Sequence, residues 1–281
     1  MRRQAITACV AALMMALTWS TPTSGAPASR ANDPQPHRGG ADLVVHRSEG
    51  DFGCTSGFTV RSWDDGKRAM ATAGHCSNAL TGVKVTSGQY TYGSFSKAAF
   101  EEKADLGLIS GTPDSAQTYA PTLWTDGGPA GSPVARRVLG KADAPAQGSS
   151  ICISGNITKL VCDITVRHLS DGVECEKDPP KRCTKGLARA VKGGHTISDF
   201  GDSGAPVFVP IDTVIDGHPV HGALLVGLFV AGGKQNPSGP DDLVVFHTVK
   251  QVECFLRVQV LTSQEADSGN TQPPTPRRDC G

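Results

Sequence analysis

Two short stretches, ATAGHC at residues 71–76 and GDSGAPV at residues 201–207, carry most of the information in this sequence. The first places His75 beside a cysteine, and the second places Ser203 in a glycine-rich turn. Between them, the stretch KADLGLI at residues 103–109 opens an apolar run with Asp105. A base, a carboxylate that can orient it and a nucleophile therefore occur in the order His, Asp, Ser, and this order differs between unrelated folds that share the chemistry.

These three side chains suit nucleophilic catalysis. A serine hydroxyl is a weak nucleophile unless a base removes its proton, and histidine has a pKa suited to that task near neutral pH. We assign His75 as the base and Asp105 as the carboxylate that fixes its tautomer. The backbone N–H groups of Gly201 and Ser203 are expected to form the oxyanion hole, because glycine lets this turn aim its amide at the substrate.

The composition limits the classes of function. The 281 residues suffice for one or two domains with a substantial core. Lys plus Arg and Asp plus Glu each number 27, so the formal charges cancel and no nucleic-acid partner is indicated. We also expect no cofactor and no metal ion. The 33 glycines and 19 prolines favour turns and short strands over long helices.

Short apolar runs separated by turn residues recur along the chain, for example at residues 57–61, 106–109 and 223–230. This pattern predicts an all-β sandwich or barrel. Near the C-terminus, Thr248 and Gln251 have the spacing of a helix capping box, which predicts a short helix. The proline-rich tail at residues 263–281 is expected to be disordered and tied down by a disulfide.

The first 28 residues have the features of a secretory signal peptide: two arginines, an apolar stretch and a small-residue cleavage site. A membrane anchor would need about 20 apolar residues, which is more than this run offers. We therefore expect a secreted, extracellular protein that has no membrane contact once the signal is removed. Residues 29–42 contain few large apolar side chains, so we expect a disordered segment or a short pro-segment.

Of the nine cysteines, Cys9 lies in the signal peptide and eight remain. An even number in an exported chain indicates disulfides, whereas a zinc site would need cysteines two to four residues apart. The spacing favours pairing between neighbours: Cys54–Cys76, Cys152–Cys162, Cys175–Cys183 and Cys254–Cys280. The charged segment 171–185 is expected to be a solvated loop stapled by one of these pairs, and the alternative is that it edges a substrate cleft.

The motifs around His75 and Ser203 resemble those of the trypsin/chymotrypsin-like serine proteases, and the layout most resembles their bacterial secreted, streptogrisin-like branch. Cys54 lies 22 residues before Cys76, which resembles the family's disulfide beside the catalytic histidine. The resemblance implies two packed six-stranded antiparallel β-barrels with the triad in the cleft between them. The protease domain would span residues 43–262, with barrel one at about 43–126 and barrel two at about 127–262.

Two residues depart from the family pattern. The family usually has Gly-Gly-Pro after the serine, where this chain has Ala205 as the second residue. Its added methyl group is tolerated if the backbone φ there is negative. The family often has a serine that hydrogen-bonds the triad aspartate from the strand lining the substrate, and Ala231 is expected at that place, so this support is lost.

The resemblance also implies the substrate contacts. Trypsin-like members have an aspartate six residues before the serine, and this chain has Ile197 there. A pocket formed by Ile197, Ser198, Phe200 and Gly233 is expected to accept an apolar residue. The segment Ala231, Gly232, Gly233 is expected to bind the substrate backbone as an added strand.

In the bacterial branch an internal arginine pairs with the acid that precedes the serine. The segment VARR at residues 134–137 resembles the one that supplies this arginine. We therefore expect an ion pair between Arg137 and Asp202, which would let the enzyme emerge active.

The sequence thus predicts a monomeric serine endopeptidase that cleaves polypeptides and can be bound by proteinaceous inhibitors. An α/β-hydrolase esterase would need Gly-x-Ser-x-Gly with the serine first in the chain, and position 205 is alanine. A catalytically weak or inactive binding protein with a protease fold is the other alternative, which Ala205 and Ala231 leave open.

Overall fold

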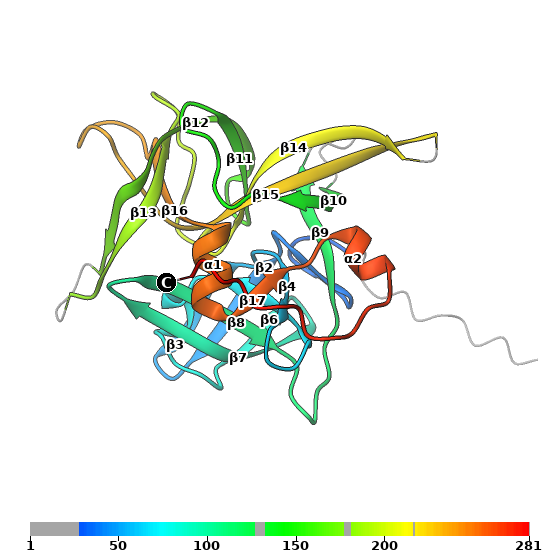
Figure 1. The fold of residues 1–281 in the computed structure, drawn as a ribbon. Coiled ribbons are helices and arrows are strands. Elements are labelled where there is room, and N and C mark those ends of the chain that lie inside the picture. The colour runs from blue at the N-terminus through cyan, green and yellow to red at the C-terminus, as the bar shows by residue number, and fades with distance from the viewer. Residues whose placement is uncertain (1–27, 127–132, 177–180, 216, 281) are drawn as a thin grey trace, which may run out of the picture.

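The computed structural model describes residues 28–126, 133–176, 181–215 and 217–280. Residues 1–27 of the expected signal peptide lie outside the described residues. Within the described ranges, no helix has both the length and the apolar character needed to cross a membrane. Almost all regular structure is β-strand, arranged as two sheets (Figure 1).

The first sheet has eight strands, joined throughout by antiparallel pairing. Its inner face buries Leu43, Phe58, Met70, Phe95 and Ile109 almost completely. In spatial order the strands are β17 (Val258–Val260), β4 (Thr59–Ser62), β5 (Arg68–Thr72), β8 (Ala104–Ser110), β7 (Tyr90–Glu101), β6 (Lys84–Ser87), β2 (Asp42–Arg47) and β3 (Gly50–Thr55).

The second sheet has nine strands, of which the last six close on themselves because the strand at its end also pairs with the fourth. In spatial order the strands are β1 (His37–Gly39), β9 (Tyr119–Asp126), β10 (Pro133–Lys141), β15 (His218–Gly233), β14 (Pro206–Ile215), β11 (Ser150–Gly155), β12 (Lys159–Cys175), β13 (Cys183–Val191) and β16 (Leu243–Thr248). The closed part is the predicted six-stranded barrel, and the other three strands extend it.

The expected division near residue 126 is only approximate. Strand β9 precedes that boundary but pairs within the second sheet, while β17, near the C-terminus, joins the first sheet through β4. A single apolar cluster includes Phe58 and Leu106 from the first sheet and Phe208 and Leu228 from the second. The two sheets therefore share a core, and burial of that apolar surface holds them together.

Three short helices complete the described fold: η1 (His75–Ser77), α1 (Val249–Leu256) and α2 (Ser263–Asp267). The predicted capping box at the start of α1 is confirmed, because the Thr248 side chain accepts from the Gln251 N–H and the Gln251 side chain accepts from the Thr248 N–H. Each contact satisfies a backbone donor that would otherwise lack a partner at the helix start.

The C-terminal tail differs from the expected disorder. It forms α2 and then runs back along the protein, where Arg61 donates to the Asn270 carbonyl. Arg277 donates to the carboxylates of Asp143 and Glu253, the latter on α1. The amino-acid composition predicted disorder wrongly, because ion pairs and a disulfide, rather than apolar burial, order this segment.

The segment 29–42 also differs from the expected disordered or removable piece. Arg30, Asp33 and His37 are buried, and β1 pairs with β9. The Arg30 guanidinium donates to the carbonyls of Gly40 and Gly155 and to the Ser154 hydroxyl. Polar side chains integrate this segment, so its low apolar content did not reveal its burial.

The four predicted disulfides are confirmed. Three of them close loops of 8, 10 and 22 residues, and the fourth joins α1 to the tail over 26 residues. All four join cysteines that are neighbours in the sequence, and two of them, Cys152–Cys162 and Cys175–Cys183, lie within single hairpins, so the spacing predicted the pairing.

Replacing Arg30 tests whether the N-terminal segment belongs to the fold. We expect Arg30→Met to lower the free energy of unfolding by at least about 2 kcal/mol, because buried acceptors lose their donor. Urea denaturation with intact disulfides measures this. Arg137→Met is the matched control: its ion pair with Asp267 is exposed, and its loss should cost less than about 1 kcal/mol. Equal stabilities of the two variants would contradict the assignment.

Candidate active site

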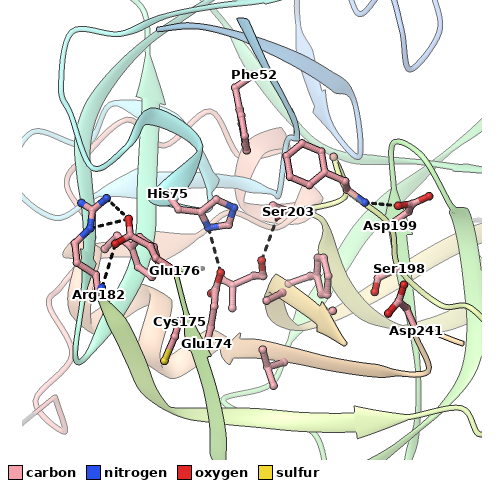
Figure 2. A pocket seen from close by; sticks show the side chains of 18 of the residues that line it. Phe52, His75, Glu174, Cys175, Glu176, Arg182, Ser198, Asp199, Ser203 and Asp241 are labelled. Atoms are coloured by element: carbon pink, nitrogen blue, oxygen red, sulfur yellow. Dashed lines mark hydrogen bonds and ion pairs between the residues drawn. The ribbon is translucent and has the colours of Figure 1, made fainter. Parts of the chain in front are cut away.

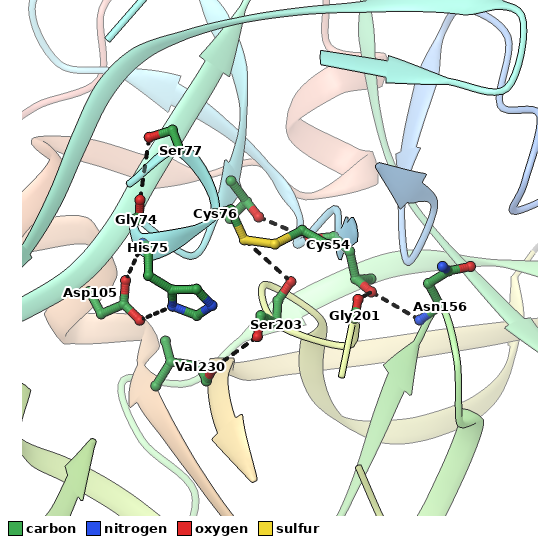
Figure 3. Close-up of a disulfide and its surroundings, with 12 residues drawn as sticks. Cys54, Gly74, His75, Cys76, Ser77, Asp105, Asn156, Gly201, Ser203 and Val230 are labelled. Atoms are coloured by element: carbon green, nitrogen blue, oxygen red, sulfur yellow. Dashed lines mark hydrogen bonds and ion pairs between the residues drawn. A yellow bond between two sulfur atoms is a disulfide. The ribbon is translucent and has the colours of Figure 1, made fainter. Parts of the chain in front are cut away.

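His75 and Asp105 meet because the strands before and after them are neighbours. His75 begins η1 just after β5, and Asp105 is the second residue of β8, which pairs with β5. The His75 ring donates from Nδ1 to Asp105 Oδ2 at 2.5 Å, and the His75 backbone N–H donates to Oδ1 at 2.7 Å. Both carboxylate oxygens of Asp105 therefore accept from His75 (Figure 3). Because Asp105 is fully buried, little water competes for these contacts.

A second histidine supports this aspartate from behind. His247 on β16 is fully buried, and its Nε2 accepts from the Asp105 backbone N–H at 3.0 Å. Burial lowers the pKa of His247 to about 4, so its ring is neutral at physiological pH and carries its proton on Nδ1. No sequence motif predicts this contact, because it joins residues 142 positions apart.

The turn that carries Ser203 is attached to both sheets. Thr55, at the end of β3, donates its backbone N–H to the Ser203 carbonyl and its hydroxyl to the Gly201 carbonyl, each at 2.8 Å. From the second sheet, the Phe229 carbonyl accepts from the Gly204 N–H at 2.8 Å. The turn is therefore fixed at the seam between the sheets, on the same side as His75 (Figure 3).

The Ser203 hydroxyl donates to the Val230 carbonyl at 3.2 Å, as Figure 3 shows. Among the described residues, no hydrogen bond joins it to His75, although both side chains line the same cleft. Catalytic hydrogen bonds are often long or misaligned without substrate and tighten when it binds. A rotation about the serine χ1 would release the hydroxyl from Val230, so the predicted pairing remains an expectation.

The two expected oxyanion donors have suitable backbone geometry. Gly201 has φ +107°, a conformation that favours glycine. Neither the Gly201 N–H nor the Ser203 N–H donates to another group within the described part of the chain. Ala205, which departs from the family pattern, is fully buried and is not among the positive-φ residues, so its methyl group is accommodated.

The predicted ion pair between Arg137 and Asp202 is wrong. Asp202 is fully buried and accepts from the N–H groups of Ile157 and Asp199 and from the Thr158 hydroxyl. Arg137 instead pairs with Asp267 at 2.5 Å on the exposed surface. The hairpin tip after β11, together with the N–H of Asp199 in the serine loop, thus supplies the carboxylate with neutral donors, and no described cation pairs with it.

The site opens into a cleft of about 940 Å³ (Figure 2). Of the expected substrate-binding residues, Ser198, Phe200, Ala231 and Gly232 line it with His75 and Ser203, whereas Ile197 and Gly233 do not. Ile197 is fully buried in the apolar cluster of the second barrel, so it cannot contact a substrate there. Segment 171–185 does edge the cleft through residues 173–176 and Arg182.

Three apolar side chains contribute to the lining of the cleft. Phe229, Leu243 and Val245 line it, together with the carboxylate-bearing Asp241. A Cβ atom placed on Gly232 would lie 1.8 Å from Ser198 Oγ, so the two walls approach closely. At the rim, Phe52 and Phe200 meet edge to face with ring centroids 5.2 Å apart, and Phe200 remains 74% exposed.

A third acidic residue, Glu174, lies beside the histidine–aspartate pair. Its Oε1 is 3.6 Å from His75 Nδ1. Burial, followed by the charge of Asp105, raises the pKa of Glu174 to about 9. From the sequence, Glu174 is expected only as part of a charged loop, because its approach to His75 depends on long-range packing.

His75, Asp105 and Glu174 also form a cluster of metal-ligand types, with ligand atoms within 4.8 Å of one another. The Nδ1 to Oδ2 distance of 2.5 Å is that of a hydrogen bond. Two ligand atoms at zinc-bond lengths in a tetrahedron lie about 3.4 Å apart. The geometry therefore fits a proton shared between imidazole and carboxylate rather than a cation between them.

Comparisons with known proteins agree with this architecture. No protein-family model matches the sequence, and no curated protein does. Among solved structures, protease A of Thermobifida fusca matches with a TM-score of 0.56 and 23% identity over 80% of this chain and 98% of that one. A glutamic acid specific serine protease that uses a histidine triad in substrate binding matches with a TM-score of 0.57 and 21% identity, over 79% of this chain and 99% of that one.

Identities this low establish the fold and no more. The chain has the all-β, two-sheet fold of the chymotrypsin-like serine proteases, with a short C-terminal helix, as the sequence motifs predicted. The roles of His75, Asp105 and Ser203 have to be argued from the site itself.

The electrostatics of His75 predict an unusual titration. Burial acts to lower the pKa of this imidazole, but the charge and hydrogen bond of Asp105 raise it to about 9. NMR titration of the ring should therefore give a midpoint well above that of an ordinary histidine, and Asp105→Asn should lower it because the attracting charge is lost. An unchanged midpoint in Asp105→Asn would show that the carboxylate does not govern the imidazole.

Proposed function

We propose that this protein is a secreted serine endopeptidase that hydrolyses peptide bonds through an acyl-enzyme intermediate. The observation that carries the proposal is the buried Asp105 holding His75 by two hydrogen bonds, in the same cleft as Ser203. The N–H groups of Gly201 and Ser203, which have no acceptor among the described residues, support the same chemistry. General base, nucleophile and oxyanion donors are the parts that acyl transfer requires.

In this mechanism His75 Nε2 takes the proton of the Ser203 hydroxyl as the oxygen attacks the scissile carbonyl. Asp105 keeps the Nδ1 proton in place and stabilises the imidazolium that forms. The negative oxygen of the tetrahedral intermediate is bound by the N–H groups of Gly201 and Ser203. His75 then protonates the leaving amine, and a water molecule repeats the sequence to release the acyl group.

A polypeptide substrate fits the open side of β15. At its end, Ala231, Gly232 and Gly233 pair with β16 on one side only, since β14 pairs with β15 only as far as Leu228. Ala231 and Gly232 also line the cleft. An extended peptide can therefore add an antiparallel strand here and present its scissile bond to Ser203.

The cleft favours an apolar residue before the scissile bond. Phe229, Leu243 and Val245 offer apolar surface, and the approach of Ser198 to Gly232 limits the width. A pocket of histidines, as reported for the glutamic acid specific neighbour, has little support, because His75 is the one histidine in the described lining. Asp241 favours a second candidate, a basic residue reaching the end of the cleft.

Four disulfides support an extracellular location, since such bonds persist in oxidising compartments. We infer a monomer that binds polypeptide substrates and proteinaceous protease inhibitors, which would enter the cleft as substrates do. The competing reading is a protease-fold binding protein with little or no activity. The hydrogen bond from Ser203 to Val230, rather than to His75, is the observation that favours it.

Replacing the nucleophile separates these two readings. Purified wild-type protein should hydrolyse casein, and Ser203→Ala should reduce the rate by at least about 10⁴-fold, because the covalent route is lost. Ser149→Ala, at a serine outside the cleft, is the matched control and should retain the wild-type rate. No hydrolysis by the wild type would favour the binding protein, and activity on short-acyl nitrophenyl esters alone would indicate an esterase.

Cleavage of a peptide library tests the specificity. We expect cleavage after medium-sized apolar residues, and Gly232→Val should reduce kcat/KM for these peptides by about tenfold or more, because the side chain would meet Ser198. Cleavage after Lys or Arg that Asp241→Asn abolishes would instead identify Asp241 as the determinant and overturn the apolar assignment.

A further inference from the structure

The hairpin formed by β12 and β13 extends from the second sheet to the first. Its tip is cross-linked by Cys175 and Cys183, which face each other on the two strands. Near this tip, the Lys185 N–H donates to the Glu102 carbonyl at 2.8 Å and the Thr184 hydroxyl donates to the Glu101 carbonyl at 2.7 Å. These acceptors lie at the turn between β7 and β8, just before Asp105.

This attachment brings Glu174, the cross-strand partner of Thr184, next to the ring of His75 (Figure 2). The Glu174 side chain is only 12% exposed, and its Oε1 lies 3.6 Å from His75 Nδ1. Its other oxygen, Oε2, is buried and has no donor among the described residues. An ionised Glu174 would therefore leave one buried carboxylate oxygen without a donor within the described part of the chain.

The available protons decide which acid is ionised. The Nδ1 proton of His75 is already shared with Asp105, which accepts a second bond from the His75 backbone. Asp105 thus has two donors that stabilise its charge, whereas no described residue donates a hydrogen bond to Glu174. Two adjacent buried carboxylates do not both ionise readily. One oxygen of Glu174 lies within 4.8 Å of an oxygen of Asp105, and burial raises the pKa of Glu174, so the proton belongs on Glu174.

The surrounding charges do not reverse this assignment. Arg182 pairs with Glu176 on the same hairpin, and Arg47 donates to the carbonyls of His75 and Cys76. His247, behind Asp105, is neutral. Among the residues that the structure describes, the imidazole of His75 is the cation that acts on Glu174, and Asp105 already shares it.

We propose that Glu174 is a positioning residue of the catalytic site, which as a neutral carboxylic acid donates a hydrogen bond to Asp105 and so holds the carboxylate that orients His75. This inference rests on the proposed peptidase function. Glu174 supplies Asp105 with a third donor, from the hairpin. The substrate strand offers no side-chain hydroxyl for this purpose, because its residues there are Val230 and Ala231. The hairpin thereby couples the cleft wall to the geometry of the triad.

Two substitutions test the role through kinetics. Glu174→Gln keeps a neutral donor of the same shape, so kcat should stay within about threefold of the wild type. Glu174→Ala removes the donor to a charged acceptor, so kcat should fall about 10- to 100-fold with little change in KM. Glu102→Gln, at the outer attachment of the hairpin, is the matched control for merely structural effects and should retain full activity.

The pH profile gives a signature that a structural role would not produce. In the wild type, His75 loses its proton and Glu174 ionises in the same alkaline range, so kcat/KM should rise towards about pH 9 and fall beyond it. Glutamine cannot ionise, so the Glu174→Gln profile should lack the alkaline fall. Persistence of that fall in Glu174→Gln, or equal loss of activity in the Gln and Ala variants, would overturn the proposal.

A measurement without turnover keeps the inference separate from the proposed function. In the full-length Ser203→Ala protein, carboxyl NMR should show that Glu174 is still protonated at neutral pH. In the same background, the NMR signal of the His75 Nδ1–H proton should survive in Glu174→Gln. It should weaken in Glu174→Ala, because that proton exchanges with water faster. Titration of Glu174 in the ordinary range of acids would refute its role even in an active enzyme. An inactive wild type with a protonated Glu174 would refute the peptidase function alone.

Discussion

The contact between Asp105 and His75 is the interaction on which the rest of the site depends. A buried carboxylate is costly unless it is hydrogen-bonded, and here one residue supplies both of the short contacts to its oxygens. In return, the aspartate fixes the tautomer and the plane of the imidazole. His247 holds the backbone of Asp105 from behind, and Glu174 approaches from the cleft. The pair is therefore enclosed from two further directions.

The fold makes this contact possible by placing short segments of both sheets at one seam. β5 and β8 bring the base and the acid together within the first sheet, while Thr55 fastens the serine turn that the second sheet supplies. A shared apolar core then prevents the sheets from sliding relative to each other. The cleft is the space left above this seam, bounded by the stapled β12–β13 hairpin.

The sequence was informative where the determinants are local. The motifs at His75 and Ser203, the capping box of α1 and the disulfides between neighbouring cysteines depend on short spacings, and the fold class followed from them. It failed where long-range packing chose the partners. Asp202 accepts hydrogen bonds from neutral donors of a nearby hairpin tip rather than pairing with Arg137. The side chain of Ile197 is buried in the core. Glu174 reaches the triad only because a hairpin crosses between the sheets. Polar contacts likewise order both terminal segments, which composition described as disordered.

Covalent labelling is the most direct test of the central claim that a histidine–aspartate pair activates the serine at this seam. The native, disulfide-bonded protein would be treated with a fluorophosphonate, digested and mapped by mass spectrometry. The account predicts one adduct, on Ser203, that His75→Ala prevents. Absence of an adduct in the native protein, or modification that does not depend on His75, would contradict it.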